Sequence, residues 1–123
     1  MQNEAPSQKG DLRQRCVRFS IWAIRFVETL SQSAADQVLA KQFLRSATSI
    51  GANVFEAFGS GSKRDFAHFF SVALKSAKET GYWLLLFRAT AKGDQQLVSE
   101  MLVECSELSR MIAASILTAK GER

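Results

Sequence analysis

The sequence has few residues that interrupt helices or form metal sites. Its 123 residues include one proline, Pro6, and one histidine, His68. The two cysteines, Cys16 and Cys105, belong to no paired motif, so we expect no metal and no other cofactor. Because both cysteines fall on apolar helical stripes, we expect buried free thiols, the alternative being a disulfide or a ligand role.

Long hydrophobic runs are also missing. No apolar stretch reaches the roughly 20 residues that a membrane-spanning helix needs, and residues 1–10 lack the apolar core of a signal peptide. We therefore expect a cytoplasmic protein without a membrane partner. The alternation of apolar and polar residues that is typical of strands is absent too, so we expect an all-α chain.

Apolar residues recur at helical spacing in four segments, which are residues 12–30, 34–58, 63–91 and 95–119. Each segment follows a residue that can cap a helix N-terminus, namely Asp11, Ser33, Ser62 and Asp94. The length suits one domain. We predict an antiparallel up-down-up-down four-helix bundle over residues 11–119, between a disordered tail, residues 1–10, and a short polar tail, residues 120–123.

Positive charge is concentrated in stripes at helical spacing. The formal net charge of +4 permits a nucleic-acid or acidic protein partner without requiring one. One stripe, in the first segment, consists of Arg15, Arg18, Trp22 and Arg25. The other, in the third segment, consists of Arg64, His68, Ser71, Lys75, Lys78 and Tyr82, with Lys63 beside it as a further candidate cation. Cations beside an aromatic ring can bind phosphates and stack on bases, the alternative being a solvated surface.

The first segment carries apolar residues on the side opposite its expected core. These are Val17, Ile21 and Ile24. A monomeric bundle usually exposes polar residues there, so we predict a contact with a second copy of the chain, with Trp83 as a further member. Scattered exposed aliphatic residues are the alternative. The fourth segment carries Glu100, Glu104 and Glu107 against a single Arg110, which complements the arginines of the first segment and predicts that these two segments pack side by side.

Small and polar residues cluster around the second and third segments. The set consists of Arg45, Ser46, Ser49, Asn53, Glu56, Ser76 and Glu79. In a hairpin that turns at residues 60–62, Arg45 lies level with Glu79 and Ser46 faces Ser76, so we predict an ion pair and a structural role. No histidine or second carboxylate completes a general acid–base pair, and we expect no enzyme activity. An enzyme that uses Asn53, Glu56 and Glu79 is the alternative, which a metal-holding pocket would favour.

Two linked patterns in this region resemble a known family. The pattern R-S-A-x-S-I-x-A-N-V-x-E-A begins at Arg45, and S-x-x-D-F-x-x-F-x-x-x-A-x-x-S-x-x-E begins at Ser62. Together they resemble the four-helix-bundle family of large-subunit ribosomal RNA intervening-sequence proteins, which is related to the accessory variability determinants of diversity-generating retroelements. The chain departs from the family at Ala57, where glycine is usual, and at Gly81, where a second carboxylate is frequent.

The resemblance implies a four-helix bundle that forms a homo-oligomer such as a pentameric ring. Together with the two basic stripes, it leads us to expect a non-catalytic adaptor that binds RNA or DNA, with a reverse-transcriptase-like protein as a further partner. The rival hypothesis is a purely protein-binding scaffold whose positive charge only maintains solubility.

Overall fold

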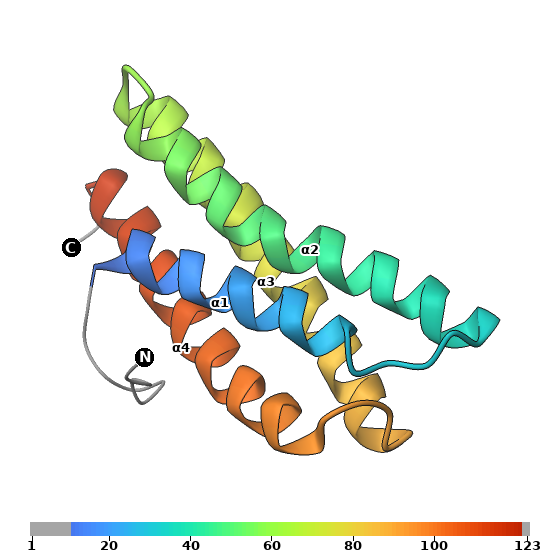
Figure 1. The fold of residues 1–123 in the computed structure, drawn as a ribbon. Coiled ribbons are helices and arrows are strands. Elements are labelled where there is room, and N and C mark those ends of the chain that lie inside the picture. The colour runs from blue at the N-terminus through green and yellow to red at the C-terminus, as the bar shows by residue number, and fades with distance from the viewer. Residues whose placement is uncertain (1–10, 122–123) are drawn as a thin grey trace.

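The protein, described by a computed structural model over residues 11–121, contains four α-helices and no strand within that range. The helices are α1 (Leu12–Val27), α2 (Ala34–Phe58), α3 (Lys63–Ala89) and α4 (Gln95–Ala119). α1 and α3 each pack against both α2 and α4. Figure 1 shows that the long hairpin of α2 and α3 extends past the start of α1. The all-α bundle is therefore confirmed, while the predicted tail of residues 1–10 lies outside the described residues.

The local signals that start each helix act as predicted. The side chains of Ser33 and Ser62 accept hydrogen bonds from the backbone N–H groups of Asp36 and Asp65, both at 3.1 Å. Asp11 and Asp94 cap α1 and α4 in the same way. Each cap satisfies a backbone donor that the first turn of a helix leaves without a partner.

The core consists of the predicted apolar stripes. Towards one end of the bundle it contains an aromatic trio of Phe26, Phe43 and Phe87, whose rings meet edge to face with centroids 4.9–5.6 Å apart. Such contacts stabilise beyond the burial of the rings themselves. Gly51 allows the close approach of α1, because a Cβ atom there would lie 3.1 Å from the Cys16 Cβ.

Two helices end earlier than predicted. α1 stops at Val27 instead of Leu30, because the Thr29 hydroxyl donates to the Phe26 carbonyl at 2.7 Å and helps to close the helix. α3 stops at Ala89 instead of at residue 91, where Ala91 is exposed with φ of 54°. The Lys92 N–H then donates to the Phe87 carbonyl at 3.0 Å, which completes a Schellman turn with alanine in the left-handed position.

Replacing Ala91 with glycine is expected to raise the free energy of unfolding by about 0.5–1 kcal/mol, because glycine adopts the left-handed conformation without steric cost. Urea unfolding followed by circular dichroism measures the change. The matched control is Ala89→Gly at the last helical residue, which should destabilise by a similar amount. A decrease in stability at both positions would contradict the left-handed conformation of residue 91.

Asp36 connects the two loops at one end of the bundle. Its carboxylate accepts hydrogen bonds from the Ser31 hydroxyl at 2.7 Å and from Lys92 Nζ at 2.6 Å. It accepts none from the Ser33 N–H, which donates to the Ser31 hydroxyl at 3.2 Å. The bond from Lys92, followed by that from Ser31, lowers the pKa of Asp36 to about 2. In the folded protein the carboxylate is therefore charged at every pH above about 2.

We expect the Asp36 contact to stabilise the protein at neutral pH and to weaken in acid. Because the pKa is lowered on folding, the stabilisation is complete above the ordinary value of about 4 and disappears as the pH falls towards about 2. The difference in unfolding free energy between wild type and Asp36→Asn should therefore shrink across this range. Urea unfolding at stepwise pH tests this, and a difference that does not change with pH would contradict it.

Candidate nucleic-acid interface

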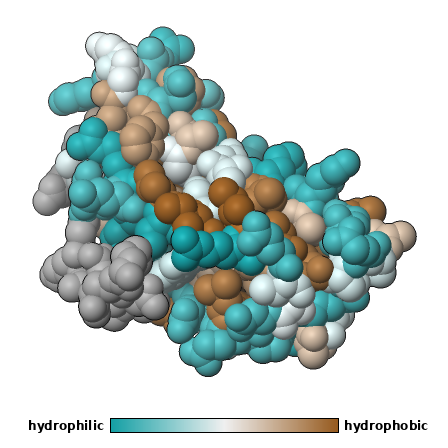
Figure 2. Space-filling view, in the orientation of Figure 1, coloured by the Kyte–Doolittle hydropathy of each residue, from teal (hydrophilic) through white to brown (hydrophobic). Residues whose placement is uncertain are grey.

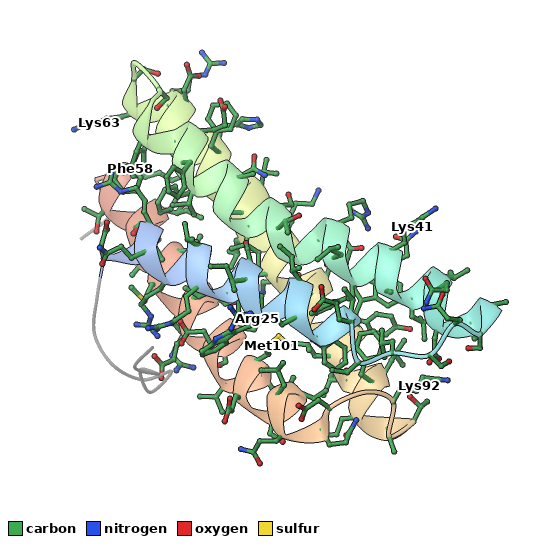
Figure 3. All side chains as sticks on the ribbon, in the orientation of Figure 1. Arg25, Lys41, Phe58, Lys63, Lys92 and Met101 are labelled. Carbon is green, nitrogen blue, oxygen red and sulfur yellow. The ribbon has the colours of Figure 1, made fainter. Side chains whose placement is uncertain are left out.

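The basic stripe predicted in the third segment lies on the solvent side of α3. Its five cationic or ionisable members, Lys63, Arg64, His68, Lys75 and Lys78, are all exposed. Four of them, Arg64, His68, Lys75 and Lys78, are spaced so that they share one face of the helix, which continues to Tyr82 with 55% of its surface exposed, while Lys63 lies beside this face at the start of α3. Figure 3 shows Lys63 pointing away from the bundle near the hairpin tip. This face therefore presents a row of positive charge to the solvent.

A hollow of about 390 Å³ lies between the start of α3 and the end of α4. Lys63, Arg64, His68 and Ser71 line it from α3, and Lys120 contributes a further cation from the end of α4. Among residues 11–121, no aspartate or glutamate lines this hollow, so its described walls favour an anion.

Lys120 was not among the predicted binding residues, because it falls in a segment predicted to be only a short tail. The sequence did hold a signal for it. α3 and α4 are joined by the turn around Gly93, and a hairpin there brings the end of α4 beside the beginning of α3. Near the middle of both helices, the Cys105 thiol of α4 donates to the Ala77 carbonyl of α3 at 3.2 Å.

The stripe predicted on the first segment is not a continuous exposed surface. Arg15 is buried, and its guanidinium donates to both carboxylate oxygens of Glu104 at 2.9 and 2.7 Å and to Glu107 at 2.6 Å. The bonds to Glu104 and Glu107 raise the pKa of Arg15 above its ordinary value. Its predicted exposure is therefore wrong, because α4 supplies its counter-charges.

The rest of this stripe also turns partly inward. Arg18 Nη2 lies 3.7 Å from Glu104 Oε2, and its guanidinium sits over the Trp22 ring at 5.5 Å from the centroid. Arg25 is the exposed cation of this stripe. These contacts confirm that the arginine-rich α1 packs beside the glutamates of α4.

The polar set on α2 and α3 forms a hydrogen-bonded layer between these helices. Arg45 forms the predicted ion pair with Glu79, and Trp83 Nε1 donates to the same carboxylate at 3.1 Å. Asn53 Nδ2 donates to the Ser49 carbonyl at 2.9 Å, whereas Glu56 is exposed. The layer fixes how α2 meets α3.

The serines of this layer pair in a register that differs from the predicted one by about one helical turn. Ser76 donates to Ser49 at 2.9 Å, and Thr80 donates to Ser46 at 2.9 Å. Ser46 therefore meets Thr80 and not Ser76. The Arg45–Glu79 ion pair is unaffected by this shift, because its residue numbers sum to 124, between the 122 of the predicted register and the 125 and 126 of the observed pairs.

An apolar surface covers the side of the bundle formed by α1 and α2. Val17, Ile21 and Ile24 are 46%, 41% and 44% exposed, and Phe55 of α2, which was not predicted, is 50% exposed beside them. Figure 2 shows hydrophobic side chains gathered in a band across this face. Trp83 lies elsewhere, half-buried in the polar layer.

The structure adds little that would support chemistry. Burial raises the pKa of both Cys16 and Cys105 to about 12, so these free thiols stay protonated and weakly nucleophilic at neutral pH. Among residues 11–121, no three His, Cys, Asp or Glu side chains gather as a metal site requires. None of the described helices is long and apolar enough to cross a membrane.

Comparison with known proteins places the chain in a family. Residues 8–114 match the family described as 23S rRNA-intervening sequence protein. A crystal structure of a protein of unknown function from the S23 ribosomal protein family of Bacteroides thetaiotaomicron VPI-5482 is 30% identical, with a TM-score of 0.80 over 86% of this chain and 98% of that chain. No curated protein matches. The chain therefore belongs to the 23S rRNA-intervening sequence protein family.

Proposed function

We propose that this protein is a non-catalytic, cytoplasmic adaptor that binds nucleic acid through the exposed basic face of α3. The observation that supports this most is the hollow at the start of α3, which Lys63, Arg64 and Lys120 line together and to which no carboxylate of the described part of the chain contributes. Lysine and arginine side chains bind the phosphates of a nucleic acid and not its bases. The affinity should therefore depend strongly on salt concentration and weakly on the nucleotide sequence.

The proposal includes a homo-oligomer of antiparallel bundles that meet through the apolar surface of α1 and α2. A pentameric ring and a reverse-transcriptase-like partner are what the family resemblance adds to the proposal. The exposed Val17, Ile21 and Phe55 support self-association, because contiguous apolar residues at a surface mark interaction sites. On nuclease-treated protein, light scattering after size exclusion should show an oligomer, and Ile21→Glu should convert it to a monomer with unchanged helix content.

Reversing the charge of Arg64, Lys75 and Lys78 to glutamate tests the proposed interface. We expect RNA affinity to fall at least about tenfold at 0.1 M salt, and the slope of log affinity against log salt to decrease by about one for each phosphate that the variant no longer binds. Fluorescence anisotropy of a labelled RNA measures both. The control reverses three exposed cations elsewhere, Arg13, Lys41 and Arg88.

The two triple variants carry the same change in net charge. If their affinities fall equally, attraction is a property of overall charge and the α3 face is not the interface. If nuclease-treated wild type binds no nucleic acid at low salt, a second candidate function, the purely protein-binding scaffold, is favoured. The apolar surface of α1 and α2 is the observation behind that alternative.

A further inference from the structure

We propose that the groove between α3 and α4 binds single-stranded nucleic acid in preference to duplex, with phosphates in the basic hollow and a base against Tyr82. This inference rests on the proposed nucleic-acid function and names its ligand more closely. It depends on a second hollow in the same groove, on the spacing of the two hollows, and on the residues that line them.

The second hollow, of about 380 Å³, lies between the middle parts of α3 and α4. Its lining is mainly apolar and small and includes Gly81, Leu85 and Leu102. Tyr82 and Leu85 at this hollow are 55% and 47% exposed. An exposed aromatic ring beside an apolar hollow provides a stacking surface for an unpaired base.

The two hollows are spaced as phosphate and base sites along one strand would be. Ser71 lines the basic hollow, and Lys78, two helical turns further on, lines the apolar one. At about 1.5 Å per residue the near edges of the two hollows are about 10 Å apart, whereas Arg64 and Tyr82, 18 residues apart in α3, are separated by about 27 Å, the length of roughly eight nucleotides at about 3.4 Å each. Lys75, exposed between them, provides a cation along that path.

The charge of the groove matches a polyanion over its whole length. Lys78 lines the apolar hollow, and the basic hollow contains Lys63, Arg64 and Lys120. Within residues 11–121, no aspartate or glutamate lines either hollow. A strand could therefore run from one hollow to the other without meeting a carboxylate at the lining.

The aromatic and apolar part of the groove favours a single strand. In a duplex the bases are paired and stacked inside, so only phosphates would reach the groove and the Tyr82 hollow would stay empty. An unpaired base can turn outward and stack on the ring. An acidic peptide would match the charge, but it would carry no flat aromatic group at regular spacing for the Tyr82 ring.

Gly81 keeps this hollow open. A Cβ atom at Gly81 would have no atom within 4 Å, so space lies directly above the helix there. Glycine inside a helix is unfavourable relative to alanine, yet here it forms part of the hollow surface. A larger side chain at this position would fill the hollow without displacing the core.

The experiment measures anisotropy of labelled single strands of RNA and DNA, about 12 nucleotides long, and of duplexes with the same number of phosphates, on nuclease-treated full chain. We expect single strands to bind at least about tenfold more tightly than duplexes. Tyr82→Ser should weaken single-strand binding by about 5- to 100-fold, the range for removal of one stacked base, and leave duplex binding unchanged. Tyr82→Phe should keep single-strand binding, and comparison of the RNA and DNA arms identifies the sugar.

Gly81→Leu is the steric test. It should weaken single-strand binding as Tyr82→Ser does, while the thermal unfolding midpoint stays at or above that of wild type. Val103→Ser is the control, because Val103 is 52% exposed but lines neither hollow. It should leave all affinities unchanged.

The failures of the two proposals are distinguishable. Equal affinity for single strand and duplex, unaffected by Tyr82→Ser and Gly81→Leu, overturns the single-strand site and leaves the nucleic-acid function intact. No binding of any oligonucleotide overturns the function itself. Binding of an oligoglutamate peptide that requires Tyr82, without binding of nucleic acid, assigns the groove to an acidic protein and overturns both.

Discussion

Replacing Glu104 with alanine is expected to lower the free energy of unfolding by about 3–5 kcal/mol. Glu104 is fully buried and accepts two hydrogen bonds from Arg15, whose own side chain is 6% exposed. The substitution leaves a guanidinium buried with much of its counter-charge removed, and an unbalanced buried charge is costly. Urea unfolding followed by far-UV circular dichroism at neutral pH measures the change.

A double substitution distinguishes the effect of removing both charges of the pair from the effect of leaving one charge buried without its partner. Arg15→Met combined with Glu104→Leu replaces both charges with apolar side chains of similar size. We expect it to restore stability to within about 1 kcal/mol of wild type or beyond, because neither charge then remains buried alone. A decrease of less than about 1 kcal/mol in Glu104→Ala alone would show that Arg15 reaches water or other partners easily.

The same pair explains why part of the predicted binding surface was wrong. Periodicity shows that Arg15, Arg18 and Arg25 share one side of a helix, but it does not show whether that side meets water or another helix. The information lies on a distant segment, in Glu104 and Glu107, which are one helical turn apart on α4. The match between the two segments was predictable, whereas the burial of one particular arginine was not.

Local sequence signals were sufficient for the elements of the fold. A cap residue followed by apolar residues at helical spacing is encoded within a few residues, so the four helix starts were correct. The helix ends were less predictable. Thr29 and Ala91 end or reverse the backbone through hydrogen bonds to nearby carbonyls, and neither residue type is a usual stop signal.

Predicting which residues of α2 and α3 contact each other required the register of the two helices. The loop between them defines that register only to within about one turn of helix. The ion pair of Arg45 and Glu79 was correct, because these two positions lie between the predicted and the observed register. The short hydroxyl group of Ser46 bonds only to a residue at its own level, so it meets Thr80 instead of its predicted partner. The groove between α3 and α4 was harder still to predict from sequence, because Gly81 and Leu102 line the same hollow only once the two helices have packed together.

The two proposed activities use different sides of the bundle. The apolar residues Val17, Ile21 and Phe55 lie on α1 and α2, whereas the basic and apolar hollows lie between α3 and α4. Self-association through the first side would leave the second open. Ile21→Glu should therefore dissociate the oligomer while the groove of each subunit keeps its preference for a single strand.

Replacing Gly93 with alanine is expected to destabilise the protein by about 2–5 kcal/mol. Gly93 has φ of +76°, and a Cβ atom there would lie 2.7 Å from Phe26 Cε1 and 3.0 Å from Leu30 Cδ2. Phe26 has no space to move, because its ring is fully buried against Phe43 and Phe87. Urea unfolding measures the decrease in stability.

Two effects contribute to this decrease: the backbone cost of a positive φ for alanine, and the collision of its Cβ atom with Phe26. They can be separated, because other positions in the chain have the positive φ without the collision. Gly121 has φ of +73° but no atom within 4 Å of its Cβ position, so Gly121→Ala should cost at most about 1 kcal/mol. Ala91, in the same turn as Gly93, already holds a left-handed conformation, which shows that strain of this kind is tolerated there. The collision with Phe26 should therefore dominate. Equal effects of Gly93→Ala and Gly121→Ala would mean that the aromatic trio yields to an added methyl group, which would contradict the tight packing of the core at this end of the bundle.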